Sequence, residues 1–92
     1  MIKNFKNKNL ERLYLHGDTR GIQPHFKEKL VRILDIMDSA GSLEDMKFPG
    51  SNLHKLEPKN ESRWSVYLSG NWRIVFMFSQ GDFFEVELKD TH

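Results

Sequence analysis

The chain has 92 residues, so we expect a single domain spanning residues 1–92 with one hydrophobic core. It contains no cysteine, which excludes disulfide bonds and thiolate metal sites. Its apolar runs neither resemble a signal peptide nor approach the roughly 20 residues that span a bilayer. We therefore expect a cytoplasmic protein that does not associate with membranes. The formal net charge is only +1, yet residues 1–32 carry eight basic and three acidic side chains, which predicts an anionic partner for this region.

Two helices are predicted in the N-terminal half of the chain. Apolar residues recur at helical spacing over residues 7–16, and Gly17 stands where a C-terminal cap of the helix would. Pro24 suits the first turn of a longer helix over residues 24–40. The apolar stripe of that helix consists of Phe26, Leu30, Ile33, Leu34 and Met37. A one-turn helix is predicted near residues 43–47.

The C-terminal third alternates apolar and polar residues, which predicts three strands in residues 64–88, and residues 2–5 are predicted as a further short strand. Three-residue loops at 69–71 and 79–81 would set the pairing of these strands. A two-residue second loop would remove three large side chains from the core, each worth about 1.5–3 kcal/mol, so we prefer the three-residue loop. The buried face then contains Trp64, Val66, Leu68, Trp72, Ile74, Phe76, Phe84, Val86 and Leu88. The elements together predict an α+β fold, with two N-terminal helices packed on a small, mostly antiparallel sheet.

The other face of the predicted sheet carries an arginine beside an aromatic ring. In the predicted register Arg73 lies between Tyr67 and Glu87. Arginine binds phosphate through two parallel hydrogen bonds, and a tyrosine ring can stack on an RNA base. The structural alternative is an Arg73–Glu87 cross-strand ion pair, worth about 0.2–1 kcal/mol. On the residues alone, the ion pair is the favoured interpretation.

Histidines suit RNA cleavage, in which the RNA's own 2′-OH attacks the neighbouring phosphate. The protein must help to remove the proton of the 2′-OH and donate a proton to the leaving 5′-oxygen. His54 and His92 are candidates because the imidazole pKa lies near neutrality. Lys55, Lys59 and Arg63 lie near His54 in the sequence and are candidates for binding RNA. Each of these residues can also be an ordinary solvated side chain, and His92 a frayed terminus. The histidines lack the spacing of a zinc site, so we expect neither a metal nor another cofactor.

Five stretches of the chain are informative together: Asn52-Leu53-His54-Lys55-Leu56, Trp64-Ser65-Val66, Gly70-Asn71-Trp72-Arg73-Ile74-Val75-Phe76, Gly81-Asp82 and the terminal Asp90-Thr91-His92. In combination they resemble the HigB branch of the RelE-type toxins. The resemblance covers nearly the whole chain and implies a RelE-like α+β fold. It also implies a ribosome-dependent, metal-independent endoribonuclease that cleaves mRNA in the decoding site. The implied partners are the ribosome, mRNA and a HigA-like helix-turn-helix antitoxin, through which alone the toxin would meet operator DNA.

The resemblance assigns catalytic roles by position. It makes His54 an acid/base or substrate-positioning residue and Arg73 the group that stabilises the phosphate in the transition state. Asp90 and His92 would complete the site, with His92 as a second acid/base candidate. Lys55, Lys59, Arg63 and Tyr67 are the residues we expect to bind RNA.

Two departures from the family pattern leave alternatives open. Thr91 stands where the family usually has tyrosine, and Glu57 where a lysine is common. We therefore hypothesise a reduced or altered sequence preference, which a Glu57→Lys variant would test. One alternative is a toxin homologue that only binds ribosomes or its antitoxin. A metal-dependent nuclease, which a chelator would inactivate, is less favoured because the chain offers few ligands.

Overall fold

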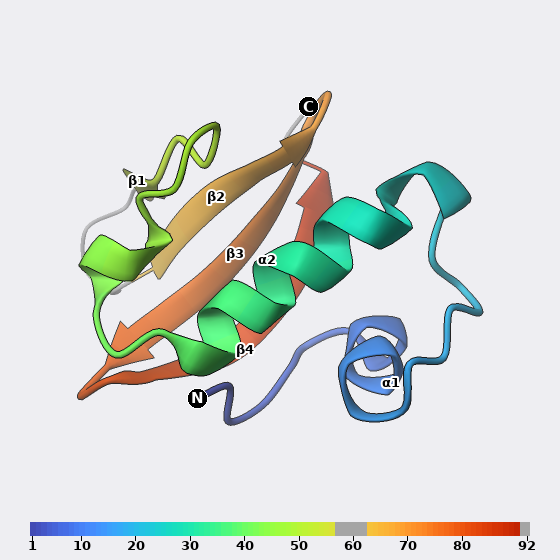
Figure 1. The fold of residues 1–92 in the computed structure, drawn as a ribbon, viewed down its shortest axis with the longest axis horizontal. Coiled ribbons are helices and arrows are strands. Elements are labelled where there is room, and N and C mark those ends of the chain that lie inside the picture. Colours follow the sequence, from blue (N-terminus) through green and yellow to red (C-terminus); the bar gives the residue numbers. More distant parts are fainter. Residues whose placement is uncertain (57–62, 91–92) are drawn as a thin grey trace.

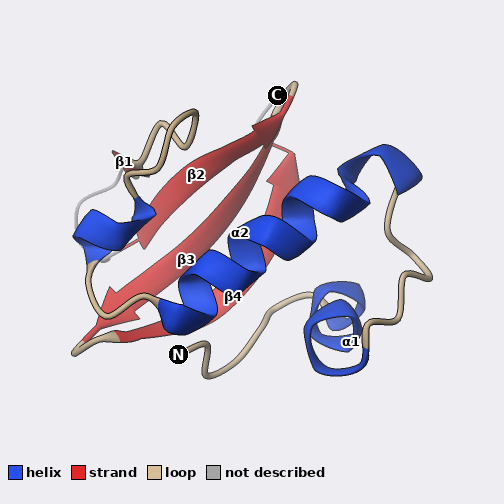
Figure 2. Ribbon diagram, viewed as in Figure 1, coloured by secondary structure: helices blue, strands red, loops and turns tan. Residues whose placement is uncertain are grey.

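The computed structural model describes residues 1–56 and 63–90, which form a layer of helices on a four-stranded antiparallel sheet (Figure 1). The elements are α1 (Lys8–His16), the 3-10 helix η1 (Pro24–Phe26), α2 (Lys27–Ser39), the 3-10 helix η2 (Leu43–Met46), β1 (His54–Lys55), β2 (Arg63–Ser69), β3 (Trp72–Ser79) and β4 (Asp82–Asp90). The strands lie in the order β1-β2-β3-β4, and α2 crosses one face of the sheet (Figure 2). The predicted α+β fold is confirmed.

The helices begin and end where local sequence signals place them. Gly17 ends α1 with a φ of 66°, and its N–H donates to the carbonyl of Leu13 at 2.9 Å, which confirms the predicted C-cap. The predicted helix over residues 24–40 opens as one 3-10 turn with Pro24 in its first turn and continues as α2. Within residues 1–56 and 63–90, no helix is long and apolar enough to cross a bilayer.

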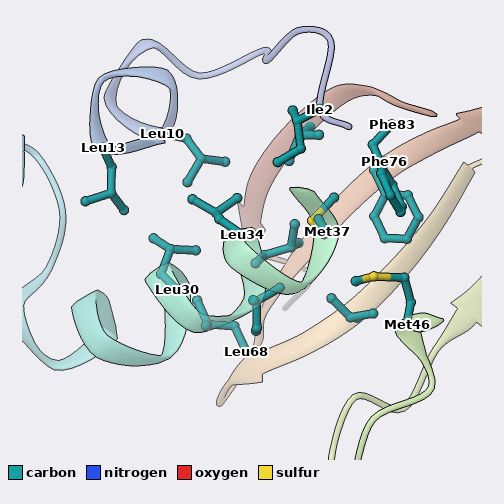
Figure 3. Packing of buried hydrophobic residues seen from close by; sticks show 14 of the residues in the cluster. Ile2, Leu10, Leu13, Leu30, Leu34, Met37, Met46, Leu68, Phe76 and Phe83 are labelled. Atoms are coloured by element: carbon teal, nitrogen blue, oxygen red, sulfur yellow. The ribbon is translucent and has the colours of Figure 1, made fainter. Parts of the chain in front are cut away.

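The core lies between α2 and the sheet, with α1 closing one side (Figure 3). Every residue of the predicted α2 stripe is buried, which is why this helix docks on the sheet. The rings of Phe76 and Phe83 meet edge to face, with centroids 5.2 Å apart. The core consists of Ile2, Leu10, Leu13, Ile22, Phe26, Leu30, Ile33, Leu34, Met37, Ala40, Met46, Val66, Leu68, Ile74, Phe76, Phe83 and Val86.

The first hairpin has the predicted register over most of its length, but the second does not. Tyr67 pairs with Arg73 as predicted, and a bulge after Tyr67 shortens the first loop. In the second hairpin Ser79 pairs with Asp82, so the turn has two residues and the predicted three-residue loop is wrong. As a result Phe83, which is fully buried, takes the core position that we predicted for Phe84.

A bulge in β4 explains how a two-residue turn is compatible with a filled core. Between the Val75–Glu87 and Met77–Phe84 pairs, β4 has one residue more than β3. Glu85 lies in this stretch and has a left-handed φ of 51°. The extra residue reverses the face on which each following side chain of β4 lies, so the predicted core positions of Val86 and Leu88 are correct.

The N-terminal segment supports this irregular part of β4. Parallel bridges join Ile2 to Phe83 and Phe5 to Val86, so the strand predicted at residues 2–5 exists only as two isolated bridges. The side-chain oxygen of Asn4 accepts a hydrogen bond of 2.5 Å from the backbone N–H of Glu85. The bulged backbone is therefore satisfied by a residue 81 positions away in the sequence.

Candidate active site

The sheet face opposite α2 carries two rows of mostly polar side chains, because residues two apart on a strand share a face. The first row is His54, Ser65, Val75 and Glu87, one residue from each strand. The second row is Tyr67, Arg73 and Lys89. We refer to these two rows as the open face. They place histidine, arginine and lysine side chains from β1, β3 and β4 on one surface.

Arg73 is held along one edge of its guanidinium. Its Nε donates to the Oγ of Ser65 at 2.7 Å, and its Nη2 donates to the backbone carbonyl of Asn52 at 2.9 Å. Ser65 is fully buried in the middle of β2, whereas Asn52 is exposed and has a φ of 49°. Nη1 makes no hydrogen bond with any residue that the structure describes. The guanidinium of Arg73 is thus anchored, and some of its N–H donors remain available.

Lys89, and not Glu87, lies across from Arg73 on β4. The predicted Arg73–Glu87 ion pair is wrong because the two-residue turn and the bulge move β4 by two residues along β3. Glu87 instead lies 3.8 Å from the Nζ of Lys6. Like charges directly opposite each other in a sheet are unfavourable unless an anion binds between them. Sequence reasoning missed Lys89 because only the bulge brings it to this position.

His54 and Lys55 form β1, but they leave the sheet on opposite faces. His54 is exposed and pairs with Ser65, the residue that also holds Arg73. Lys55 pairs with Trp64, and its Nζ lies 5.8 Å from the centre of that ring. The structure therefore brings His54 to the open face with Arg73 and separates Lys55 from it.

Two other candidates for RNA binding have partners within the protein. The hydroxyl of Tyr67 accepts a hydrogen bond of 2.9 Å from the N–H of Gly70, and the Nζ of Lys29 lies 4.9 Å from the centre of its ring. Arg63 donates to Glu85 at 2.7 Å, and this hydrogen bond holds the pKa of the Glu85 carboxyl below its usual value. Stacking by Tyr67 would thus have to use the ring face that Lys29 does not cover.

The remaining candidates lie at or beyond the ends of the described ranges. Asp90 is the exposed last residue of β4 and pairs with Trp72, so its row differs from that of Arg73. The predictions for Lys59 and His92, and those for Glu57 and Thr91, fall outside the described residues. The structure therefore does not bring Asp90 into the rows of the open face.

Comparison with known proteins decides the family. Residues 3–92 match the model of the family described as the RelE-like toxin of the type II toxin–antitoxin system HigB. The chain belongs to the HigB-like toxins. It is 33% identical to an endoribonuclease HigB from Proteus vulgaris over 92 residues, the full length of both chains. It is also 27% identical over 82 residues to an uncharacterized protein from Haemophilus influenzae, which covers 87% of this chain and 81% of that protein.

The open face of this HigB-like toxin is suited to bind a phosphate group. Arg73 offers a fork of N–H donors, and Lys89 adds a second positive charge on the same row. His54 lies on the neighbouring row of the same face, two strands away from Arg73. An imidazole can give or take a proton near neutral pH. The open face thus combines groups that can bind an anion with a group that can transfer a proton.

Proposed function

We propose that this HigB-like toxin is a ribosome-dependent endoribonuclease that cleaves mRNA in the decoding site without a metal ion. The observation that carries the proposal is the row of Arg73 and Lys89 on the open face, with His54 on the neighbouring row. The reaction class is supported by the Proteus vulgaris relative, whose name is endoribonuclease HigB.

The proposed reaction forms one bond and breaks another at a single phosphorus atom. The 2′-oxygen of the RNA attacks the adjacent phosphate, and the bond to the leaving 5′-oxygen breaks. A cyclic phosphate and a free 5′-hydroxyl result. Of His54 and His92, one takes the proton of the 2′-OH and the other protonates the leaving oxygen. Arg73 stabilises the negative charge that builds up on the phosphate. Asp90 would join the site from the end of β4, outside the two rows of the open face.

The proposed partners are the ribosome, its mRNA and a HigA-like helix-turn-helix antitoxin. The basic region over residues 1–32 suits ribosomal RNA, because phosphate contacts supply most non-specific affinity for nucleic acid. Lys59 and Arg63 would add contacts near the substrate. Operator DNA would be reached only through the antitoxin, and the toxin would act in the cytoplasm.

The proposal is tested by mapping cuts in a defined mRNA with purified toxin, with and without translating ribosomes, and in the presence of a chelator. We expect cuts only in the translated mRNA, unchanged by the chelator and lost in a His92→Ala variant. Cleavage that the chelator abolishes would contradict the metal-independent reaction. Growth arrest without any cleavage would instead favour a toxin that only binds ribosomes or its antitoxin.

Lys89 is the candidate that the structure adds to the site, and its removal should weaken cleavage. We expect Lys89→Ala to lower the cleavage rate by about 10- to 100-fold, since a hydrogen bond to a charged group contributes roughly 1.5–3 kcal/mol. Lys47→Ala is the matched control, because that lysine pairs with Glu44 at 3.0 Å and lies beside η2, outside the open face. Equal rates for the two variants in the ribosome assay would remove Lys89 from the site.

A further inference from the structure

We propose that Ser65 and Asn52 are positioning residues, which hold the guanidinium of Arg73 in the orientation that phosphate binding requires. The inference rests on the proposed function, because it deepens the role of Arg73 in cleavage. Neither Ser65 nor Asn52 would touch the RNA for this purpose. Both would act through Arg73.

Ser65 is well suited to hold the guanidinium of Arg73 in place. Its side chain is fully buried, and a buried hydroxyl is costly unless it has a hydrogen-bond partner. That partner is the Nε of Arg73 at 2.7 Å, a charge-assisted hydrogen bond. Ser65 also pairs with His54 on one side and with Val75 on the other, so it is fixed in the middle of its row. A fixed acceptor defines the plane of the group that it holds.

Asn52 contributes its backbone and not its side chain. Its carbonyl accepts a hydrogen bond of 2.9 Å from the Nη2 of Arg73, and its φ of 49° is a conformation that asparagine and glycine adopt more readily than other residues. Next to it, the carbonyl of Ser51 accepts a hydrogen bond of 2.7 Å from the N–H of Tyr67. Asn52 lies two residues before His54, so the same contact links Arg73 to the segment that carries the histidine.

The two anchors leave the donors that a phosphate needs. Arginine has five N–H donors, of which Ser65 and Asn52 take one from Nε and one from Nη2. Those of Nη1 and the second of Nη2 meet no acceptor among the described residues, and they can form the two parallel bonds of a phosphate contact. Displacement of a catalytic group by about 1 Å can lower a rate by roughly 100-fold, so the anchoring should matter for turnover.

The first test combines Ser65→Ala with Arg73→Ala in the ribosome assay under single-turnover conditions. We expect Ser65→Ala alone to lower the maximal rate by about 10- to 100-fold. In the Arg73→Ala background it should change the residual rate by less than about twofold, because residues that act as a unit are not additive. Ser65→Thr, which keeps the hydroxyl, should restore most of the rate. A general structural role would instead slow both backgrounds equally, and that result would overturn the proposal.

The second test does not depend on activity. The Nε–H of Arg73 should give a protected signal in a ¹⁵N spectrum, identified by its loss in Arg73→Lys, and Ser65→Ala should remove that protection. An unchanged signal would overturn the positioning role of Ser65. If the wild-type protein shows the protected signal but no cleavage with translating ribosomes, the proposed function fails while the anchoring stands.

Asn52 has its own matched pair of variants. Asn52→Gly keeps the left-handed backbone and should cleave within about twofold of the wild-type rate. Asn52→Val disfavours that backbone and should lower the rate by about tenfold or more, but only while Arg73 is present. Equal rates for the glycine and valine variants would overturn the role of the Asn52 carbonyl.

Discussion

Replacing Arg73 with alanine should slow the cleavage of ribosome-bound mRNA by about 1,000-fold or more. Under the proposed function this side chain stabilises the charge that the phosphate gains in the transition state. Single donors or arginines in comparable roles contribute roughly 10²- to 10⁵-fold. The measurement is the single-turnover rate of cleavage at mapped sites, with saturating ribosome–mRNA complex.

Arg73→Lys separates charge from geometry in the same assay. The lysine keeps a positive charge but has neither an Nε to bond Ser65 nor a planar fork for the phosphate. We expect its rate to fall between those of the wild type and the alanine variant. Thermal unfolding of both variants must show a folded protein, because each leaves the buried hydroxyl of Ser65 without its partner. Wild-type cleavage by a folded Arg73→Ala variant would contradict the proposed mechanism.

Local signals in the sequence were sufficient for most of the fold. Pro24 and Gly17 mark helix boundaries through backbone properties that hold in any context, and alternation of apolar residues identifies the strands. The second hairpin could not be predicted in this way. Its bulge depends on Glu85 in a left-handed conformation, and a hydrogen bond that the N–H of Glu85 donates to the distant Asn4 stabilises it. No local pattern contains that contact.

In the candidate site, too, local sequence predicts some residues, and contacts between distant parts of the chain determine the others. The sequence predicts Arg73 as a site residue because it stands on an inner strand of the sheet, beside Tyr67 in a register that the first hairpin confirms. Lys89 lies opposite Arg73 because of the two-residue turn and the bulge, whereas the predicted three-residue turn without a bulge places Glu87 opposite Arg73. The sequence places Ser65 on the correct face, but its hydrogen bond with Arg73 depends on the conformation of the arginine side chain, which the sequence does not show. Asn52 acts through a carbonyl, and residue type says little about where a carbonyl lies.

Phe83→Ala should lower the free energy of unfolding by about 3–5 kcal/mol, the range for truncating a buried phenylalanine. Phe83 is fully buried, and its ring contacts those of Phe76 and Phe78, with centroids 5.2 Å and 5.0 Å away. Figure 3 shows Phe83 beside Phe76 on the side of the sheet that faces Met37. Phe84 is the matched control, since it is the same residue type, half-buried and on the opposite face. Phe84→Ala should cost clearly less in denaturant unfolding followed by linear extrapolation.

Which of Phe83→Ala and Phe84→Ala lowers the free energy of unfolding more also bears on the candidate site. If Phe84→Ala were the more destabilising variant, β4 would have the register of a three-residue turn without a bulge, and Phe84 would face α2. In that register Glu87 would lie opposite Arg73 and neutralise it, and the row of two cations would not exist. The two-residue turn that buries Phe83 acts together with the bulge after Phe84 to bring Lys89 opposite Arg73. A stability measurement on the core therefore tests the turn on which that part of the site depends.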